Sequence, residues 1–245
     1  MEDASALTPA TSQNKISIDQ LSKLFGTFVA LCNLTVELAC GRIYVILGEN
    51  GAGKSTLLRV LAGITSANAG EVRWPSPLSG KKSTDLHQAR IGYMAHASML
   101  YDELSARENL EYFAGLYAQY ANAETLPPWA GPENSLRAVG LDPALARPVG
   151  QYSQGMRQRV SLARAVQHDP ALVLLDEPFS NVDAESARRM IALIVAMRDA
   201  QRTVILTTHQ PALVEDVADE FLTMASGTIA SRRAGGAMRK PGASV

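Results

Sequence analysis

Apolar residues follow two different periods along the chain, and these predict strands in some segments and helices in others. Ile16 and Ile18 alternate with polar residues, and NLTVELA at 33–39 repeats the alternation, so we expect half-exposed strands in an antiparallel β layer. Continuous apolar runs occur at 42–47 (RIYVIL), 171–178 (ALVLLDEP) and 203–209 (TVILTTH). Such runs are typical of buried parallel strands.

Helical periodicity occupies the intervals between these runs. KSTLLRVLAG at 54–63 predicts a helix that ends at Gly63. A second helical segment at 102–120 collects its large apolar residues on one face, namely Leu110, Phe113, Ala114 and Tyr117. The alternation of strands and helices predicts an α/β fold with a mostly parallel core sheet. We place a helical subdomain at about residues 97–168, inserted within a sheet domain that covers residues 15–230.

Composition narrows the function classes only slightly. The chain is 47% hydrophobic and 19% charged with a net charge of −1, so no field of one sign favours nucleic acid as a partner. Cys32 and Cys40 lack the spacing of a zinc or redox site, and we expect both thiols to be buried. Residues 1–14 and 231–245 are rich in small and polar residues and are predicted to be flexible tails.

The localisation follows from two absences in the sequence. The N-terminal segment is acidic and has no apolar stretch, which excludes an ordinary secretory signal. No run reaches the roughly 18 apolar residues that a membrane-spanning helix needs. We therefore expect a cytoplasmic protein, with any membrane role exerted through a partner.

The strongest chemical signal is a glycine-rich loop between the run at 42–47 and the helix at 54–63. Its spacing, glycine followed after four residues by Gly-Lys-Ser, suits backbone N–H groups that wrap a β-phosphate. Lys54 is expected to reach the β and γ oxygens, and Ser55 to ligate Mg²⁺. The candidate cofactor-binding residues of this loop are Gly48, Glu49, Asn50, Gly51, Ala52, Gly53, Lys54, Ser55 and Thr56.

Two further runs end in residues suited to phosphate chemistry. Asp176 and Glu177 end a buried run, at the edge of the sheet where α/β proteins bind ligands. Asp176 is expected to hold Mg²⁺, and Glu177 to deprotonate the attacking water. His209 ends the next run, where its imidazole is placed to donate to a γ-phosphate oxygen.

A second candidate phosphate site lies in YSQGMRQRVSLARA at 152–165. Ser153 and Gly155 precede a basic helical segment, and a helix start offers free N–H groups to an anion. A simple helix cap is the alternative interpretation. The question is why one chain would hold phosphate in two places.

The order of these motifs resembles the nucleotide-binding subunit of ATP-binding-cassette (ABC) transporters. The resemblance rests on the phosphate loop, YSQGM, LLDEP, SNVD at 180–183 and TTHQP, and it extends from about residue 16 to about residue 230. It implies an ABC ATPase that uses ATP and Mg²⁺. It also answers the question, because in this family the signature closes over a γ-phosphate held by a second subunit.

The resemblance implies roles for several further residues. Ser153, Gln154 and Gly155 stand for the signature and Asp183 for the acid that links the two subunits. Phe25 matches the aromatic residue that stacks on adenine, with Phe28 as the nearby alternative. Two departures are the Gln154 that replaces a glycine and the His96 that replaces the glutamine sensing Mg²⁺ and water.

His96, a leucine-containing loop and the sequence ENL together resemble the ATP-binding subunit of the cytochrome c maturation system, which is linked to haem export. A general exporter of drugs, lipids or polysaccharides is the main alternative. A soluble ABC ATPase, such as an iron–sulfur assembly factor, and a metabolic kinase are alternatives from other classes.

A transport role implies transmembrane permease subunits and a second cassette, expected to form a homodimer, as partners. The chain would then be peripheral at the inner face of the cell membrane. We expect the docking surface near the loop after His96 and the helical subdomain.

Overall fold

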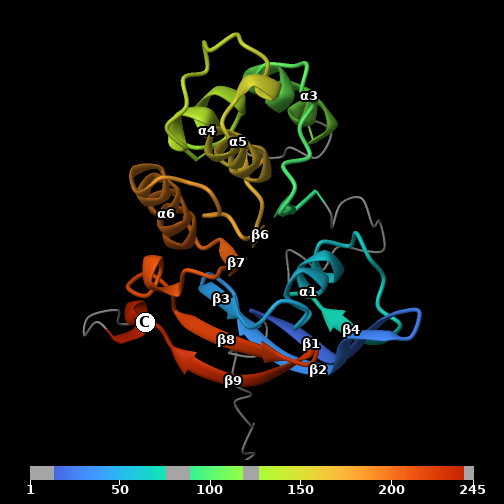
Figure 1. Ribbon diagram of the computed structural model, residues 1–245. Coiled ribbons are helices and arrows are strands. Elements are labelled where there is room, and N and C mark those ends of the chain that lie inside the picture. Colours follow the sequence, from blue (N-terminus) through green and yellow to red (C-terminus); the bar gives the residue numbers. More distant parts are fainter. Residues whose placement is uncertain (1–13, 76–88, 118–126, 240–245) are drawn as a thin grey trace, which may run out of the picture.

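The computed structural model describes residues 14–75, 89–117 and 127–239, and its centre is a six-stranded sheet (Figure 1). The strand order is β5-β6-β7-β3-β8-β9, and all but β9 run parallel. The bounds are Ile91–Met94 for β5, Leu172–Asp176 for β6, Thr203–Thr207 for β7, Ile43–Leu47 for β3, Glu220–Ala225 for β8 and Thr228–Ala234 for β9. The predicted apolar runs therefore form β3, β6 and β7.

A second, antiparallel sheet has the order β2-β1-β4. It consists of β1 (Lys15–Phe25), β2 (Phe28–Ala39) and β4 (Ala69–Arg73). The predicted α/β fold with a parallel core and an antiparallel layer is confirmed. Sequence periodicity did not reveal β4, β5, β8 and β9, and β4 is short and mostly exposed.

The parallel strands are apolar on both faces because each face is covered by a separate core. Side chains of a strand alternate between the two sides. Ile43 and Val45 accordingly belong to a core shared with the helices, whereas Tyr44 and Ile46 belong to a core shared with the antiparallel sheet and α1. Because β3, β6 and β7 run parallel, the polar residues that follow these strands lie at one edge of the sheet.

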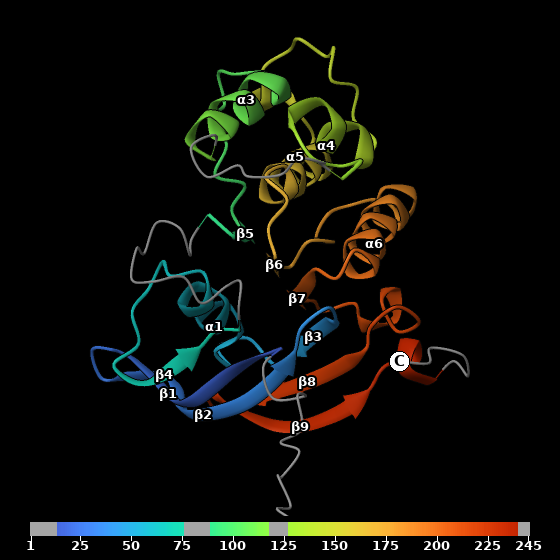
Figure 2. The ribbon, with the colours of Figure 1, turned by 180° about the vertical axis from the view of Figure 1, so that it is seen from behind.

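The helices are α1 (Lys54–Leu61), α3 (Ala106–Tyr117), α4 (Pro132–Ala138), α5 (Gln154–Val166), α6 (Ala184–Asp199) and the short α7 (Gly236–Arg239), with 3-10 turns η3 (Val149–Gln151) and η4 (Pro211–Leu213). In both views α3, α4 and α5 gather at one end of the molecule, away from β1, β2 and β9 (Figures 1 and 2). Leu110 is fully buried there, and Phe113, Ala114 and Tyr117 are half-buried.

The C-terminal segment is more ordered than the sequence predicted. We expected a flexible tail from residue 231, but β9 continues to Ala234 and α7 follows. Arg232 pairs with Glu220 at 2.6 Å, and the Arg233 guanidinium lies 3.8 Å from the centre of the Phe221 ring. These contacts with β8 explain the extra strand. Residues 1–13 and 240–245, the rest of the predicted tails, lie outside the described residues.

The two cysteines are less buried than we expected. Cys32 is exposed on β2, next to Asn33, whose positive φ of 44° interrupts the strand's alternation. Cys40 is half-buried, and burial raises the pKa of its thiol. In the described part of the chain, no helix is both long and apolar enough to cross a membrane.

Candidate functional site

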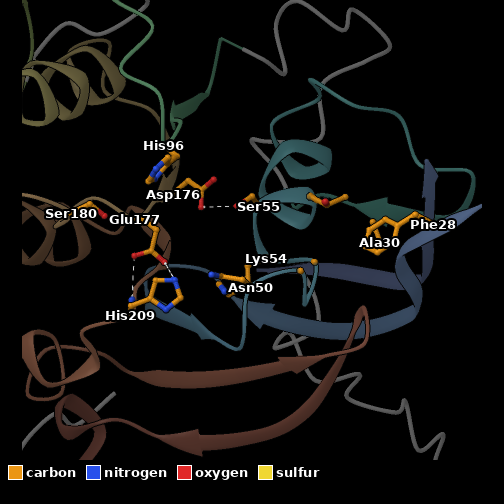
Figure 3. A pocket seen from close by; sticks show the side chains of 13 residues that line it. Phe28, Ala30, Asn50, Lys54, Ser55, His96, Asp176, Glu177, Ser180 and His209 are labelled. Atoms are coloured by element: carbon orange, nitrogen blue, oxygen red, sulfur yellow. Dashed lines mark hydrogen bonds and ion pairs between the residues drawn. The ribbon is translucent and has the colours of Figure 1, made fainter. Parts of the chain in front are cut away.

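A cavity of about 430 Å³ lies where the carboxyl ends of β3, β5, β6 and β7 meet. Its lining comes from the loop after β3, the start of α1, the ends of three other strands and β2. The lining residues are Phe28, Ala30, Asn50, Gly51, Gly53, Lys54, Ser55, Thr56, His96, Asp176, Glu177, Ser180 and His209 (Figure 3). The sheet thus assembles residues from widely separated parts of the sequence.

The loop after β3 requires glycine at its tightest points. Gly48 has a φ of 146° and Gly53 a φ of 100°, a region that other residues rarely adopt. A Cβ atom at Gly48 would collide with the carbonyl oxygen of Met224, and one at Gly53 with that of Ala30. Gly53 precedes α1 without a side-chain cap, so the first N–H groups of this helix remain available to an anion.

Lys54 is the buried cation of this loop. Its Nζ donates to the carbonyl oxygens of Gly48 at 2.7 Å and Glu49 at 2.9 Å, and the residue is only 7% exposed. Carbonyl oxygens compensate part of the charge without neutralising it. The ammonium therefore lies within the cavity as a positive group suited to a phosphate.

Asp176 and Ser55 bring two oxygen ligands together. Ser55 Oγ donates to Asp176 Oδ1 at 3.0 Å, and the aspartate is 2% exposed at the end of β6. A hydroxyl and a carboxylate beside a phosphate loop are the oxygen donors that Mg²⁺ prefers. The residues therefore fit a magnesium ion, with room in the cavity for its water ligands.

Glu177 and His209 form the second polar pair. Glu177 Oε2 accepts from the backbone N–H of His209 at 3.2 Å, and His209 Nε2 lies 3.4 Å from Oε1, an ionic contact only when the imidazole is protonated. The glutamate side chain is 13% exposed and the histidine 56%. A shielded carboxylate facing the phosphate loop suits a base that takes a proton from water.

His96 follows the end of β5 and lies near Asp176 at the upper rim of the cavity in Figure 3. The structure therefore brings together Lys54, Ser55, Asp176, Glu177, His209 and His96, all of which we singled out from the sequence. Glu49, Gly48 and Ala52 belong to the same loop but line a neighbouring hollow.

The signature residues lie outside this cavity. Ser153 caps α5, and its Oγ accepts from the Met156 N–H at 3.2 Å. Ser153 and Gln154 are exposed, and a Cβ atom at Gly155 would lie 2.8 Å from the Asn181 carbonyl oxygen. The second candidate phosphate site therefore lies on the surface and not in the cavity beside the chain's own loop.

Asp183 also lies outside the cavity, as the cap of α6. Its carboxylate accepts from the Ser186 N–H at 2.9 Å and the Ser186 hydroxyl at 2.7 Å, and these bonds lower its pKa. It is thereby held ionised on the surface. Asp183 and the start of α5 form an exposed polar face rather than a closed site.

The two candidate aromatic residues occupy different positions on the β1–β2 turn. Phe28 lines the cavity and is 56% exposed, on the far side from Glu177 and His209 in Figure 3. Phe25 does not line it, and Lys23 Nζ lies 5.0 Å from the centre of its ring. The structure therefore places the alternative residue, Phe28, closer to the phosphate loop.

Sequence reasoning missed three polar residues next to the carboxylates. Thr207 bonds to Asp176 and to the Glu177 backbone, and Gln158 Nε2 donates to the Glu177 carbonyl at 3.3 Å. Ser180 lines the cavity. The polar Thr207 at the end of an apolar strand was a signal that could have been followed.

Comparisons with known proteins agree with this arrangement. A sequence model of the family described as "ABC transporter" matches residues 31–180. The ABC transporter ATP-binding protein NatA of Bacillus subtilis is 34% identical over 203 residues, which cover 82% of this chain and 80% of NatA.

Two other relatives differ in the direction of transport that their names state. The sulfate/thiosulfate import protein CysA of Synechocystis is 33% identical over 87% of this chain and 59% of CysA. The fluoroquinolones export protein Rv2688c of Mycobacterium tuberculosis is 35% identical over 77% of this chain and 60% of Rv2688c. The chain thus spans about three fifths of these two proteins.

Solved structures share the fold. An ATP-binding subunit of an ABC transporter superposes with a TM-score of 0.76 at 24% identity, covering 91% of each chain. The cassette MJ0796, described as a dimer bound to ADP and Pi, superposes with a TM-score of 0.74 at 22% identity, covering 89% of this chain and 98% of that one.

Proposed function

The chain belongs to the ABC transporter family, and on this basis we propose that it is the ATP-hydrolysing subunit that powers a membrane transporter. The observation that carries the proposal is the single cavity in which the phosphate loop meets Asp176, Glu177 and His209. Its cofactors are ATP and Mg²⁺. Loop, cation, magnesium ligands and base are the parts that nucleotide hydrolysis needs.

The groups of the cavity would divide the proposed reaction among them. The loop N–H groups and Lys54 would bind the triphosphate, and Ser55 and Asp176 would hold Mg²⁺, which would neutralise charge on the phosphate oxygens. Glu177 accepts the proton of the attacking water. His209 lies against the Glu177 carboxylate and would donate to the γ-phosphate, while His96, at the opposite rim, would be placed to sense the water and Mg²⁺.

We further propose that the signature serves a second copy of the chain. Ser153 is exposed and Gly155 is half-buried, both outside the chain's own cavity, so their donors would be available to a triphosphate held by another subunit. A head-to-tail dimer would hold two ATP molecules between the chains, with Asp183 in the contact. Loss of the γ-phosphate would remove the ligand that the two subunits share, and the dimer would reopen.

The adenine is expected to lie against the β1–β2 turn. Phe25 matches the family's position for the stacking aromatic residue, whereas Phe28 already lines the cavity. Tryptophan or leucine substitutions at each position, followed by measurement of ATP affinity, assign the contact. A loss at Phe25 would require the turn to move when the nucleotide binds.

The surface beside His96 is suited to contact a permease. A hollow of about 270 Å³ between α1, β5, α3 and α5 is rimmed by Ile64 and Met99, which are 58% and 59% exposed. Tyr101, Tyr112 and Leu116 are exposed on the same helical end. Arg164 also lines the hollow and donates to the Met99 carbonyl oxygen at 2.9 Å. Burial lowers the pKa of its guanidinium.

The direction of transport and the cargo depend on the permease. Relatives include an importer and an exporter by name. Our finer proposal is an exporter linked to haem in cytochrome c biogenesis, and it rests on His96 and the ENL segment. In this proposal the subunit is bound to the inner face of the cell membrane through its permease.

Capture of the ATP-bound complex tests the proposal. Tagged Glu177→Gln protein would be incubated with ATP in native membranes and its partners identified by mass spectrometry. The Lys54→Ala/Glu177→Gln double variant is the control that cannot hold nucleotide. Nucleotide-dependent recovery of permease subunits supports transport, and cytochrome-maturation subunits would support the haem linkage. Recovery of soluble partners alone would overturn the transport role.

A further inference from the structure

Thr207 contacts both carboxylate residues of the cavity with one oxygen atom. It is the last residue of β7, is fully buried, and pairs with Asp176 across the parallel strands. Its Oγ1 donates to Asp176 Oδ1 at 2.9 Å and accepts from the N–H of Glu177 at 2.9 Å. The Thr207 hydroxyl is therefore a donor to Asp176 and an acceptor from Glu177.

We infer that Thr207 is a positioning residue for ATP hydrolysis, an inference that rests on the proposed function. Its hydroxyl orients the carboxylate that holds Mg²⁺ and fixes the backbone that carries the general base. Thr207 is not among the residues that line the cavity, so it would act through Asp176 and Glu177.

Packing alone does not explain a threonine at this position. The three residues before it, Val204, Ile205 and Leu206, are apolar and fully buried, and valine has nearly the same shape as threonine. A buried hydroxyl is unfavourable unless it is hydrogen-bonded. Here the hydroxyl donates to the Asp176 carboxylate and accepts from the Glu177 backbone N–H, so both of its hydrogen-bonding functions are satisfied within the site.

The backbone at Glu177 needs such support. Consecutive side chains of a strand point to opposite faces, yet both Asp176 and Glu177 line the cavity. A positive φ of 54° at Glu177 makes this possible, and it is a strained conformation for a residue with a side chain. The Thr207 hydroxyl accepts from the Glu177 N–H. The Gln158 side chain and the Ser180 backbone N–H each donate to the Glu177 carbonyl oxygen at 3.3 Å.

The Asp176 carboxylate is oriented from two sides. Its Oδ1 accepts from Ser55 Oγ at 3.0 Å and from Thr207 Oγ1 at 2.9 Å. Residues that orient metal ligands in this way typically contribute about 10- to 100-fold to metal affinity or activity. Loss of the Thr207 hydroxyl should therefore affect both the use of Mg²⁺ and turnover.

A conservative pair of variants separates positioning from packing. Thr207→Val removes the hydroxyl and keeps the shape, whereas Thr207→Ser keeps the hydroxyl and removes a methyl group. Thr203→Val is the matched control, because Thr203 lies at the far end of β7, is 1% exposed, and accepts from the Gly41 N–H at 3.0 Å. Turnover, ATP affinity and Mg²⁺ dependence would be measured on the purified full chain, normalised to its folded fraction.

We expect Thr207→Val to lower kcat by about 10- to 100-fold and to raise the Mg²⁺ concentration needed for half-maximal rate. Its ATP affinity without Mg²⁺ should stay unchanged, and Thr207→Ser and Thr203→Val should keep most of the wild-type kcat. Wild-type kinetics for Thr207→Val would overturn the inference. An equal loss in Thr207→Ser or Thr203→Val would also overturn it, because packing would then be the cause.

The proposed function and this inference fail in different ways. Absence of ATP turnover by the wild-type chain would count against the ATPase proposal. The Mg²⁺ enhancement of ATP affinity would then decide on Thr207. If Mg²⁺ no longer enhances the ATP affinity of Thr207→Val but still enhances that of Thr207→Ser, the positioning role is supported. Equal enhancement in the wild type, Thr207→Val and Thr207→Ser would overturn the inference.

Discussion

The starts of α1 and α5 are both helix N-termini next to glycine, but they are built differently. α1 follows Gly53 with no side-chain cap, and it begins at Lys54 inside the cavity. α5 follows Ser153, whose hydroxyl caps the helix, and it begins on the exposed surface. The first helix start lies among Asp176, Glu177 and His209, and the second does not.

The start of α1 belongs to a cavity whose lining comes from one chain, whereas the start of α5 has no such lining around it. The uncapped N–H groups of α1 are available to an anion within the chain's own cavity. Ser153 is already bonded within α5, so its fold does not depend on a phosphate. We interpret α5 as the half of a composite site that a second copy completes.

The largest effect is expected at Glu177, inside the complete site. Glu177→Gln removes the general base and should lower turnover by about 10² to 10⁴-fold, because proton transfer of this kind contributes that much. ATP binding should persist, and ATP-bound dimer should accumulate on size-exclusion chromatography. Glu185→Gln, on the exposed surface of α6, is the control. Full turnover by Glu177→Gln would remove it as the base.

The next largest effect is expected at Lys54. Lys54→Ala should weaken ATP binding by about 10- to 100-fold, because a hydrogen bond to a charged group contributes roughly 1.5–3 kcal/mol. Isothermal titration with ATP measures this loss. The exposed Lys15→Ala, which loses a surface contact with Glu37, should bind as the wild type does. Unchanged affinity in Lys54→Ala would contradict the phosphate-loop assignment.

Mixing two impaired variants tests whether α5 serves another chain. Ser153→Asp keeps a good helix cap but adds negative charge toward a partner's triphosphate. Lys54→Ala and Ser153→Asp chains combined in one dimer leave one site intact, and equal mixing should restore about a quarter of wild-type sites. Ser153→Asn, an uncharged cap, is the control. If mixing restores no turnover, the signature acts within its own chain.

The smallest effect is expected at His96, on the rim. His96 lines the cavity, and glutamine keeps a side chain that can donate and accept a hydrogen bond, so His96→Gln should alter turnover much less than Glu177→Gln. Steady-state rates at saturating ATP and Mg²⁺ measure the change. A loss of turnover as large as that of Glu177→Gln would give His96 a direct part in proton transfer.

Much of the fold could be predicted because its periodicity is strong. Apolar runs ending in polar residues located β3, β6 and β7, and hence the edge at which the site forms. The order in space, β6-β7-β3, could not be read from the chain, because it depends on crossovers through the helices. β9 was missed because its arginines are stabilised by tertiary partners such as Glu220, which a local pattern does not reveal.

The candidate site, like the fold, could be predicted from the sequence only in part. Residues that carry a charge or a glycine, such as Lys54 and Asp176, were recognised by spacing. Thr207 and Gln158 were not, because their importance comes from contacts with Glu177 across the sheet and from α5. The position of Phe28 relative to Phe25 depends on the geometry of a two-residue turn, which composition does not determine.

The outward direction of Ser153 has a consequence for how activity depends on concentration. A composite site in free solution forms in proportion to the frequency with which two chains meet, so dilution should reduce turnover per chain. Attachment of two copies to one permease would replace this dependence with a fixed effective concentration, which short tethers can bring to the millimolar range. The membrane partner would then supply proximity as well as a path for the cargo.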